Sequence, residues 1–157
     1  MIRKAEPRDL PRVIELFHLL LQHLKECGQW AYHRDQQQFE NGVAGYVASK
    51  LFGSEEHIVL VSENDNGQVE GFLIGWIIGF APFFQFQTVA ELQWLYPLSW
   101  KCAPSLRNAF EDWAKAKGAT ARSNYITPGN EVSEIAMKRD GSKLAFHYYF
   151  KPFETGE

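Results

Sequence analysis

The segment from His57 to Phe80 constrains the fold more than any other part of the chain. It reads HIVLVSENDNGQVEGFLIGWIIGF, two runs rich in β-branched residues on either side of Asp65-Asn66-Gly67. Asn-Gly between two such runs is a strong local signal for a β-hairpin, because both residues tolerate the positive φ of tight turns. The sequence therefore predicts two antiparallel strands in the middle of the chain.

Helices are predicted wherever apolar residues recur every three or four positions. The four segments with this pattern span residues 8–28, 35–56, 103–119 and 129–141. The third is the clearest, since Pro104 lies in its first turn and Gly118 can cap its end. In the first segment Asp9 is positioned as the N-cap and Gly28 as the stop signal.

Further strands are predicted where apolar and polar residues alternate or β-branched and aromatic residues gather. These segments are residues 1–5, 88–98, 121–127 and 143–153. The resulting order, β-α-α-β-β-β-α-β-α-β, implies a mixed sheet with helices packed on its faces, an α+β or α/β fold. The length suits one core, and no repeat or linker interrupts it, so residues 1–157 are interpreted as a single domain.

Charge and composition exclude several classes of function. The net charge is −3, and no run of Lys or Arg exceeds two, so nucleic-acid binding is not expected. The most apolar segment, 71–86, is too short to span a bilayer, and charged residues near the N-terminus argue against a signal peptide. Two cysteines cannot form a disulfide framework, and the five histidines lack zinc-ligand spacing, so no metal is expected. We interpret the protein as cytoplasmic, or as virion-associated if a bacteriophage encodes it.

Several motifs together resemble the GNAT family, the Gcn5-related N-acetyltransferases, over nearly the whole chain. IRKAEPRDLPRVIELF is similar to the family's opening strand and helix, NGQVEGFLIGWI to its central hairpin, and AELQWLYP to its fourth strand. LRNAFEDWAKAKGA resembles the helix after the coenzyme loop. NEVSEIAMKRDG resembles the pattern Asn-x-x-Ala-x-x-x-Tyr-x-x-x-Gly, with Asn130 and Gly141 at the outer positions.

This resemblance implies a GNAT-like fold and transfer of an acetyl group from acetyl-coenzyme A to an amine. In that family the fourth and fifth strands part around the coenzyme, and N–H groups of the loop before the third helix hold the pyrophosphate. The reaction needs a base or water relay for the amine, an N–H for the oxyanion, and an acid for the leaving thiolate.

The resemblance implies a coenzyme site at Leu98, Ser99, Trp100, Lys101, Cys102, Ala103, Ser105 and Asn130. The loop 98–105 departs from the family, because no glycine stands where the family's phosphate loop has two. Side chains at these positions keep backbone amides from converging, so weakened phosphate binding is expected. Lys101 and the helix dipole can still contribute. The alternatives are exposed loop residues at Lys101 and Ser105, and an N-cap at Asn130.

Two positions bear on the chemistry. Glu91, in the strand AELQW, matches a position where some family members carry the general base, and burial there would raise its pKa. The alternative is a carboxylate that points outward from a half-exposed strand. Met137 occupies the position of the family's usual general-acid Tyr, and a thioether cannot donate a proton.

The loop from Phe80 to Phe86 is unusually aromatic for a turn. Its four phenylalanines, with Trp30 and Tyr32, are predicted either to line an acceptor site, to form an interface, or to fold onto the core. Two hypotheses follow. The chain is an acetyltransferase for a small-molecule or peptide amine, or it is a GNAT-like binding or assembly protein without catalysis, of the kind some bacteriophages encode. A protein partner would use the Phe80–Phe86 loop, and a homodimer is a separate interpretation.

Overall fold

The computed structural model describes residues 1–28, 36–80, 85–126 and 129–144. The elements in chain order are β1 (Ile2–Lys4), the 3-10 helix η1 (Pro7–Asp9), α1 (Leu10–Glu26), α2 (Gln36–Leu51), β2 (His57–Glu63), β3 (Val69–Gly79), β4 (Thr88–Pro97), α3 (Ala103–Ala116), β5 (Ala121–Asn124) and α4 (Glu131–Arg139). The predicted order is confirmed over these residues. Most of the last predicted strand, 143–153, lies outside them.

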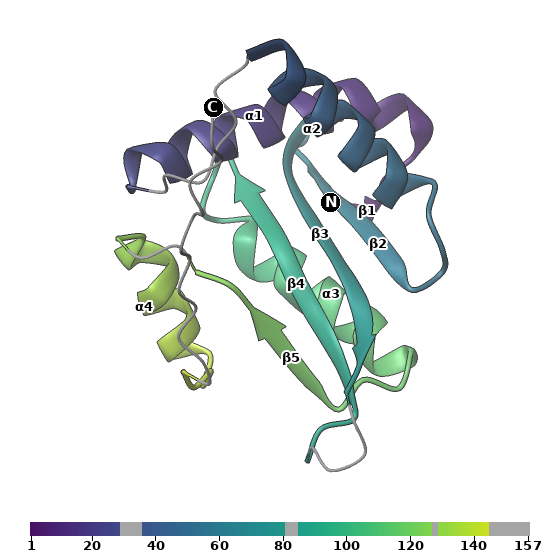
Figure 1. Cartoon of the computed structure of the whole chain (residues 1–157), viewed down its shortest axis with the longest axis vertical. Coiled ribbons are helices and arrows are strands. Elements are labelled where there is room, and N and C mark those ends of the chain that lie inside the picture. The colour runs from purple at the N-terminus through teal and green to yellow at the C-terminus, as the bar shows by residue number, and fades with distance from the viewer. Residues whose placement is uncertain (29–35, 81–84, 127–128, 145–157) are drawn as a thin grey trace, which may run out of the picture.

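The strands form one mixed sheet in the order β1-β2-β3-β4-β5. Neighbours pair antiparallel from β1 to β4, and β5 pairs parallel to β4. The parallel pair requires a crossover, which α3 supplies. Figure 1 shows α1 and α2 on one side of the sheet, α3 on the other, and α4 beside β5. The predicted fold class, a mixed sheet with helices on its faces, is confirmed.

The predicted central hairpin is β2 and β3. In its loop the Asn64 side-chain oxygen accepts hydrogen bonds from the N–H groups of Asn66 and Gln68, both at 3.0 Å. Gly67 adopts a φ of +74°, a conformation that residues with a Cβ rarely adopt. The side chain of Asn64 thus organises a turn that only a residue such as glycine can complete at position 67.

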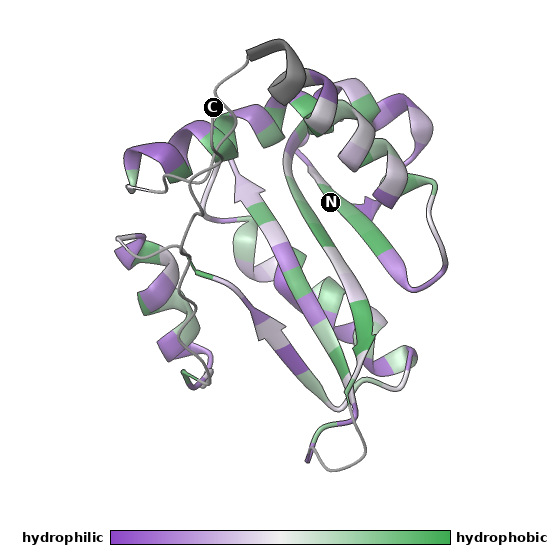
Figure 2. Cartoon of the chain, in the orientation of Figure 1, coloured by the Kyte–Doolittle hydropathy of each residue, from purple (hydrophilic) through white to green (hydrophobic). Residues whose placement is uncertain are grey.

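Each face of the sheet buries its own hydrophobic cluster. The first lies under α1 and α2 and includes Val13, Leu16, Phe17, Leu20, Leu21, Val43, Val47, Val59, Val61, Phe72 and Ile74. The second lies under α3 and includes Ile58, Leu60, Leu73, Ala90, Leu92, Leu106, Phe110 and Ala114. Figure 2 shows hydrophobic residues concentrated along β2 and β3, the strands covered on both faces.

A β-bulge interrupts the pairing of β4 with β3. Ile74 pairs with Trp94 and Gly75 with Leu92, which leaves Gln93 without a partner on β3. An extra residue reverses which side chains face which side of the sheet. Consequently Glu91 and Trp94 share the face under α1 and α2, although strict alternation would put them on opposite faces.

A cluster of charges ties the N-terminal segment to the sheet. Arg3 donates to both carboxylate oxygens of Asp9, at 2.7 and 2.9 Å, and through Nε to Glu63 on β2 at 2.9 Å. Asp9 also accepts from the N–H of Glu6, and it stands at the predicted N-cap position of α1 without capping that helix through its side chain. Hydrogen bonds from Arg3 hold the pKa of Asp9 below its usual range.

Candidate functional site

Strands β4 and β5 part near the middle of β4. Their last paired residues are Leu92 and Asn124, whereas β4 continues to Pro97. Figure 1 shows the two strands diverging toward their C-terminal ends. Beyond Leu92, N–H groups of β4 that face β5 have no ladder partner on that strand. The parting expected from the family resemblance is therefore present.

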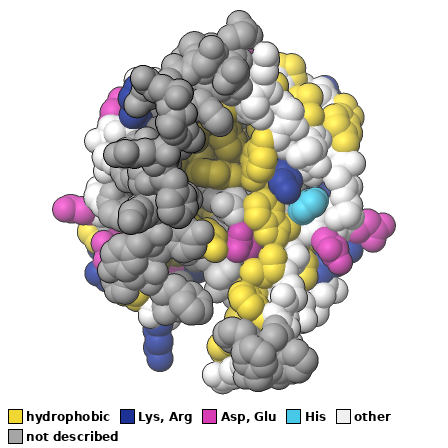
Figure 3. Space-filling view, in the orientation of Figure 1, with side chains coloured by type: hydrophobic (Ala, Val, Ile, Leu, Met, Phe, Trp, Pro, Cys, Tyr) yellow, Lys and Arg dark blue, Asp and Glu magenta, His cyan; other side chains and the backbone are white. Residues whose placement is uncertain are grey.

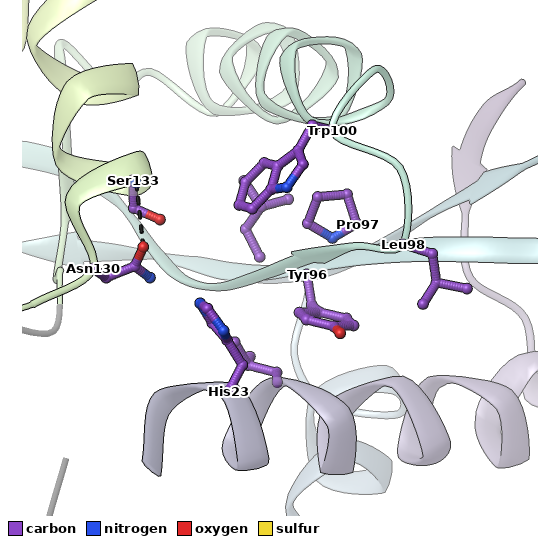
Figure 4. A pocket seen from close by; sticks show the side chains of 9 residues that line it. His23, Tyr96, Pro97, Leu98, Trp100, Asn130 and Ser133 are labelled. Carbon is purple, nitrogen blue, oxygen red and sulfur yellow. Dashed lines mark hydrogen bonds between the residues drawn. The ribbon is translucent and has the colours of Figure 1, made fainter. Parts of the chain in front are cut away.

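A cleft of about 210 Å³ lies at the end of β4, between α1, α4 and the loop before α3. Its lining residues are Leu20, His23, Leu95, Tyr96, Pro97, Leu98, Trp100, Asn130 and Ser133. Figure 4 shows the Trp100 indole reaching into this cleft from the loop, opposite Asn130 and Ser133 of the α4 start. Trp100 narrows the cleft without closing it, since its side chain stays 54% exposed.

Asn130 caps α4. Its side-chain oxygen accepts a hydrogen bond from the N–H of Ser133 at 3.3 Å (Figure 4). The N-cap alternative is thus confirmed. The same side chain lines the cleft, so its NH₂ group can still donate to a ligand there, and this second role stays a prediction.

The loop between β4 and α3 uses most of its own amides internally. Cys102 N–H donates to Ser99 O at 3.1 Å, and Ala103 N–H lies 3.4 Å from Trp100 O. Lys101 N–H lies 3.4 Å from the Ser99 hydroxyl. Pro104 has no N–H to offer. Among the described residues, the N–H groups at 99, 100 and 105 have no acceptor, so they are the ones a phosphate could use.

The side chains of the predicted coenzyme loop fall into two groups. Lys101 and Ser105 are exposed, as is Leu98, and Ser99 is half-buried. Cys102 and Ala103 are buried, and the Cys102 thiol donates to Ser99 O at 3.1 Å. Those two can therefore offer a ligand only backbone atoms. The loop therefore offers a phosphate one side-chain cation and few amides, and the weakened binding expected from the sequence stays a prediction.

Glu91 lies buried on the sheet face under α1 and α2, with 8% of its surface exposed. The outward-pointing alternative is therefore wrong. Burial raises the pKa of Glu91, and a hydrogen bond with Tyr125 opposes part of that rise. A carboxylate whose pKa lies above its usual range is suited to take a proton near neutral pH, and its catalytic role stays a prediction.

Aromatic residues surround this carboxylate. Trp76 is its direct neighbour on β3, and Ser123 its neighbour on β5. The Trp94 indole N–H donates to the Tyr46 hydroxyl at 2.9 Å, and burial raises the pKa of Tyr46 to about 12. Figure 3 shows an acidic side chain in a hollow among hydrophobic ones on this face. The hollow and the cleft at the end of β4 lie along the same strand.

Met137 contacts a different group. Its sulfur lies 3.8 Å from a guanidinium nitrogen of Arg122, which also binds Glu111 and Asp140 at 2.9 and 2.7 Å. Arg122, Glu111 and Asp140, but not Met137, line a second cavity of about 320 Å³ between α3, β5 and the end of α4. The carboxylate partners neutralise Arg122, so that guanidinium is not free to bind a phosphate.

The predicted aromatic surface is only partly described. Phe80 and Phe86 are 38% and 45% exposed, whereas residues 81–84 lie outside the described part of the chain, as do Trp30 and Tyr32. The interface prediction therefore stays open. In the described segments no group of three or more His, Cys, Asp or Glu side chains could hold a metal ion. Those same segments include no helix with the length and apolar character needed to cross a bilayer.

Sequence reasoning missed several residues that the structure brings to the site. His23 and Leu20 reach the cleft from α1, and Tyr96 from β4. Lys50 reaches the aromatic hollow from α2. His23 follows Leu20 by three residues, so the sequence indicates that both lie on the same face of the helix. Nothing in the sequence shows which part of the protein that face packs against.

Solved acetyltransferases share this fold. Aminoglycoside N-acetyltransferase AAC(6')-Iy in complex with CoA superposes with a TM-score of 0.75 at 17% identity, covering 98% of this chain and 94% of that one. AAC(6')-IG from Acinetobacter haemolyticus gives 0.72 at 18% identity, over 98% and 99%. A mutant of a Bacillus halodurans protein gives 0.79 at 17%, over 98% and 99%. No family model matches the sequence, and no curated protein matches it significantly. The chain has the fold of GNAT acetyltransferases.

Proposed function

We propose that this protein transfers the acetyl group of acetyl-coenzyme A to an amine. The observation that supports the proposal best is the parting of β4 from β5 beside Glu91, a buried carboxylate with a raised pKa. The fold it shares with an acetyltransferase bound to CoA adds to that support. Acetyl-coenzyme A supplies an activated thioester, and the chain's residues bind it, place the amine and accept its proton.

The cleft residues would hold the coenzyme. Tyr96 and Trp100, which line the cleft, contact the apolar arm. Lys101, exposed on the loop beside the cleft, and the N–H groups at 99, 100 and 105 face the phosphates. Along a strand each residue rises about 3.3 Å, so Glu91 lies about 13 Å from Leu95. A chain that enters at the loop and follows β4 therefore brings its far end toward the hollow.

The chemistry then falls to few groups. Glu91 takes the proton of the amine, directly or through water. Unpaired N–H groups of β4 beyond Leu92 stabilise the oxyanion. Met137 cannot protonate the thiolate, which leaves without a side-chain acid at that position. Because a thiol's ordinary pKa is about 8.5, the thiolate is an acceptable leaving group near neutral pH.

Calorimetric titration with acetyl-coenzyme A tests the proposal. Binding is expected to weaken as salt rises, and Lys101→Ala is expected to lower affinity about two- to fivefold, the effect of one exposed charge. Lys115→Ala, which removes an exposed lysine of α3 outside the cleft, is the matched control. Glu91→Gln should lower turnover, followed as thiol release, while coenzyme affinity is kept.

One result would contradict the proposal directly. If millimolar acetyl-coenzyme A produces neither heat nor a rise in melting temperature, the pocket does not bind it. That outcome would favour the other hypothesis, a binding protein without catalysis.

A further inference from the structure

Lys50 places a positive charge at the edge of the hollow that contains Glu91. It lies in the last turn of α2, and its ammonium sits 4.4 Å from the centre of the Trp76 ring and 5.5 Å from that of Tyr46. Both distances are within the range of cation–π attraction. Figure 3 shows a basic side chain next to a histidine at the margin of the hydrophobic surface on this face.

In the part of the chain that the structure describes, no carboxylate pairs with this ammonium. Among the described residues Lys50 forms no ion pair, whereas Lys117 and Lys138 both do. The aromatic rings restrain its long side chain but satisfy none of its three N–H donors. An ammonium held in this way can still donate its N–H groups to an anion.

The neighbouring histidine does not compete for an anion. His57 packs edge-on against Trp76 at 5.9 Å between ring centres, and its Nδ1 is buried without a hydrogen-bond partner. Burial, with a further contribution from Lys50, lowers the pKa of His57. The lowered pKa favours the neutral form of His57, although Glu56 opposes part of the shift, so Lys50 is the cation that an anion would meet at this end of the hollow.

One indole ring separates the two charged groups. Trp76 is the cross-strand neighbour of Glu91 on one side and lies under Lys50 on the other. The Cβ atoms of directly paired strand residues lie about 5 Å apart, and the Lys50 ammonium lies 4.4 Å beyond the Trp76 ring centre. The carboxylate and the ammonium are therefore on the order of 10 Å from each other. Hydrogen bonds of about 2.8 Å at each end leave room for a molecule with an amine and a carboxylate a few bonds apart.

We propose that the acyl acceptor is a small amino acid, whose amine faces Glu91 and whose carboxylate binds Lys50 over Trp76. This inference rests on the proposed function and narrows its acceptor. In the transfer, the amine nitrogen forms a bond to the thioester carbonyl carbon, the carbon–sulfur bond breaks, and coenzyme A leaves as its thiolate. The proton of the amine passes to Glu91. A polycationic acceptor is disfavoured, because its second charge would meet the Lys50 ammonium.

Matched acceptors that differ only in the carboxylate test the proposal. Coenzyme A release is measured with leucine against leucinamide and phenylalanine against phenylalaninamide, with spermidine as a polycation. The acids are expected to give a kcat/KM about tenfold higher than the amides, the effect of one charge-assisted hydrogen bond. An amide's amine is the less basic and so more available as a nucleophile, which means that a preference for the acids reports recognition of the carboxylate.

Substitutions then assign that preference to one side chain. Lys50→Met is expected to reduce the ratio of acid to amide toward one, while Lys50→Arg restores part of it. Lys115→Met, on an exposed part of α3, should leave the ratio unchanged. A KM effect that grows with salt is expected for the acids and not for the amides.

The outcomes separate this inference from the one it rests on. If acetyl-coenzyme A does not bind, the proposed function fails first. If it binds but amides or spermidine are used as well as the acids, the amino-acid proposal alone is overturned. It is also overturned if Lys50→Met affects acid and amide equally. If no acceptor turns over, the thermal shift of the coenzyme-saturated protein decides: stabilisation by the acids and not the amides supports the proposal, and its absence overturns it.

Discussion

Gly75 is the position where one methyl group should do the most damage to the sheet. A Cβ built there would lie 2.5 Å from Cε2 of Phe110 on α3 and 2.7 Å from the backbone oxygen of Glu91 on β4. Ordinary contacts begin at 3.4 Å, so the shortfalls are 3.4 − 2.5 = 0.9 Å and 3.4 − 2.7 = 0.7 Å. The ring can move in principle, but the backbone of a paired strand cannot without breaking its ladder.

The expected change in unfolding free energy for Gly75→Ala is the balance of two opposing effects. Overpacking in a filled core costs about 1–3 kcal/mol. Replacing a glycine by alanine recovers about 0.4–1 kcal/mol, because the unfolded chain has less freedom. The contact with a backbone oxygen places Gly75→Ala near the upper part of the range, so we expect a net loss of about 2 kcal/mol. For a chain of this size that corresponds to a drop in melting temperature of roughly 4–8 °C.

Urea denaturation followed by tryptophan fluorescence, with a thermal melt in parallel, measures this loss. Gly79→Ala is the matched control, since it lies on the same strand and a Cβ there meets nothing within 4 Å. Adding Phe110→Leu to Gly75→Ala should not recover full stability, because the Glu91 oxygen still blocks the methyl group. If Gly75→Ala is as stable as Gly79→Ala, the argument that β3, β4 and α3 pack rigidly at this point is refuted.

Three further changes test groups near the site and the N-terminal clamp. Because burial raises the pKa of Glu91, the stability that its protonated form contributes is present below about pH 4 and is lost as pH rises through the folded pKa. Urea titrations should therefore show the unfolding free energy of Glu91→Gln rising relative to the wild type over that pH range. Unfolding free energies that change in parallel with pH in the two proteins would contradict this expectation. Hydrogen bonds from Arg3 lower the pKa of Asp9, so Asp9→Asn should cost about 1–3 kcal/mol at neutral pH, and the difference in unfolding free energy should shrink as acid protonates Asp9. Tyr46→Phe removes the acceptor of the half-buried Trp94 N–H and should cost about 1–2 kcal/mol by the same measurement; an unchanged midpoint would mean that water replaces the hydroxyl.

Local sequence patterns predicted much of the fold. The hairpin around Gly67 and the helix whose first turn contains Pro104 could be predicted, because a turn or a cap depends on neighbouring residues alone. Both occur at the predicted positions. The parting of β4 from β5 was reached through family resemblance, since no local pattern in ARSN says where its pairing stops.

The site was less accessible to sequence reasoning, and β4 shows why. Alternation along AELQWLYP assigns Glu91 and Trp94 to opposite faces, but the bulge at Gln93 puts them on the same one. Lys50 is remote from both in the sequence and reaches Trp76 only through the packing of α2 on the sheet. Contacts of this kind depend on tertiary geometry, which residue spacing does not encode.

The unpaired Gln93 has a consequence for how this strand tolerates insertions and deletions. Removing Gln93 alone would leave Leu92 opposite Gly75 and Trp94 opposite Ile74, so β4 would alternate regularly and its later side chains would keep their faces. Removing Leu95 instead would turn Tyr96 from the α1 face toward α3. A deletion in the turn at 64–68 would shorten only a solvent-facing loop. At Gln93 the length of β4 can therefore shrink by one residue without moving any side chain to the other face, whereas a deletion at Leu95 should destabilise the chain more than one in the turn.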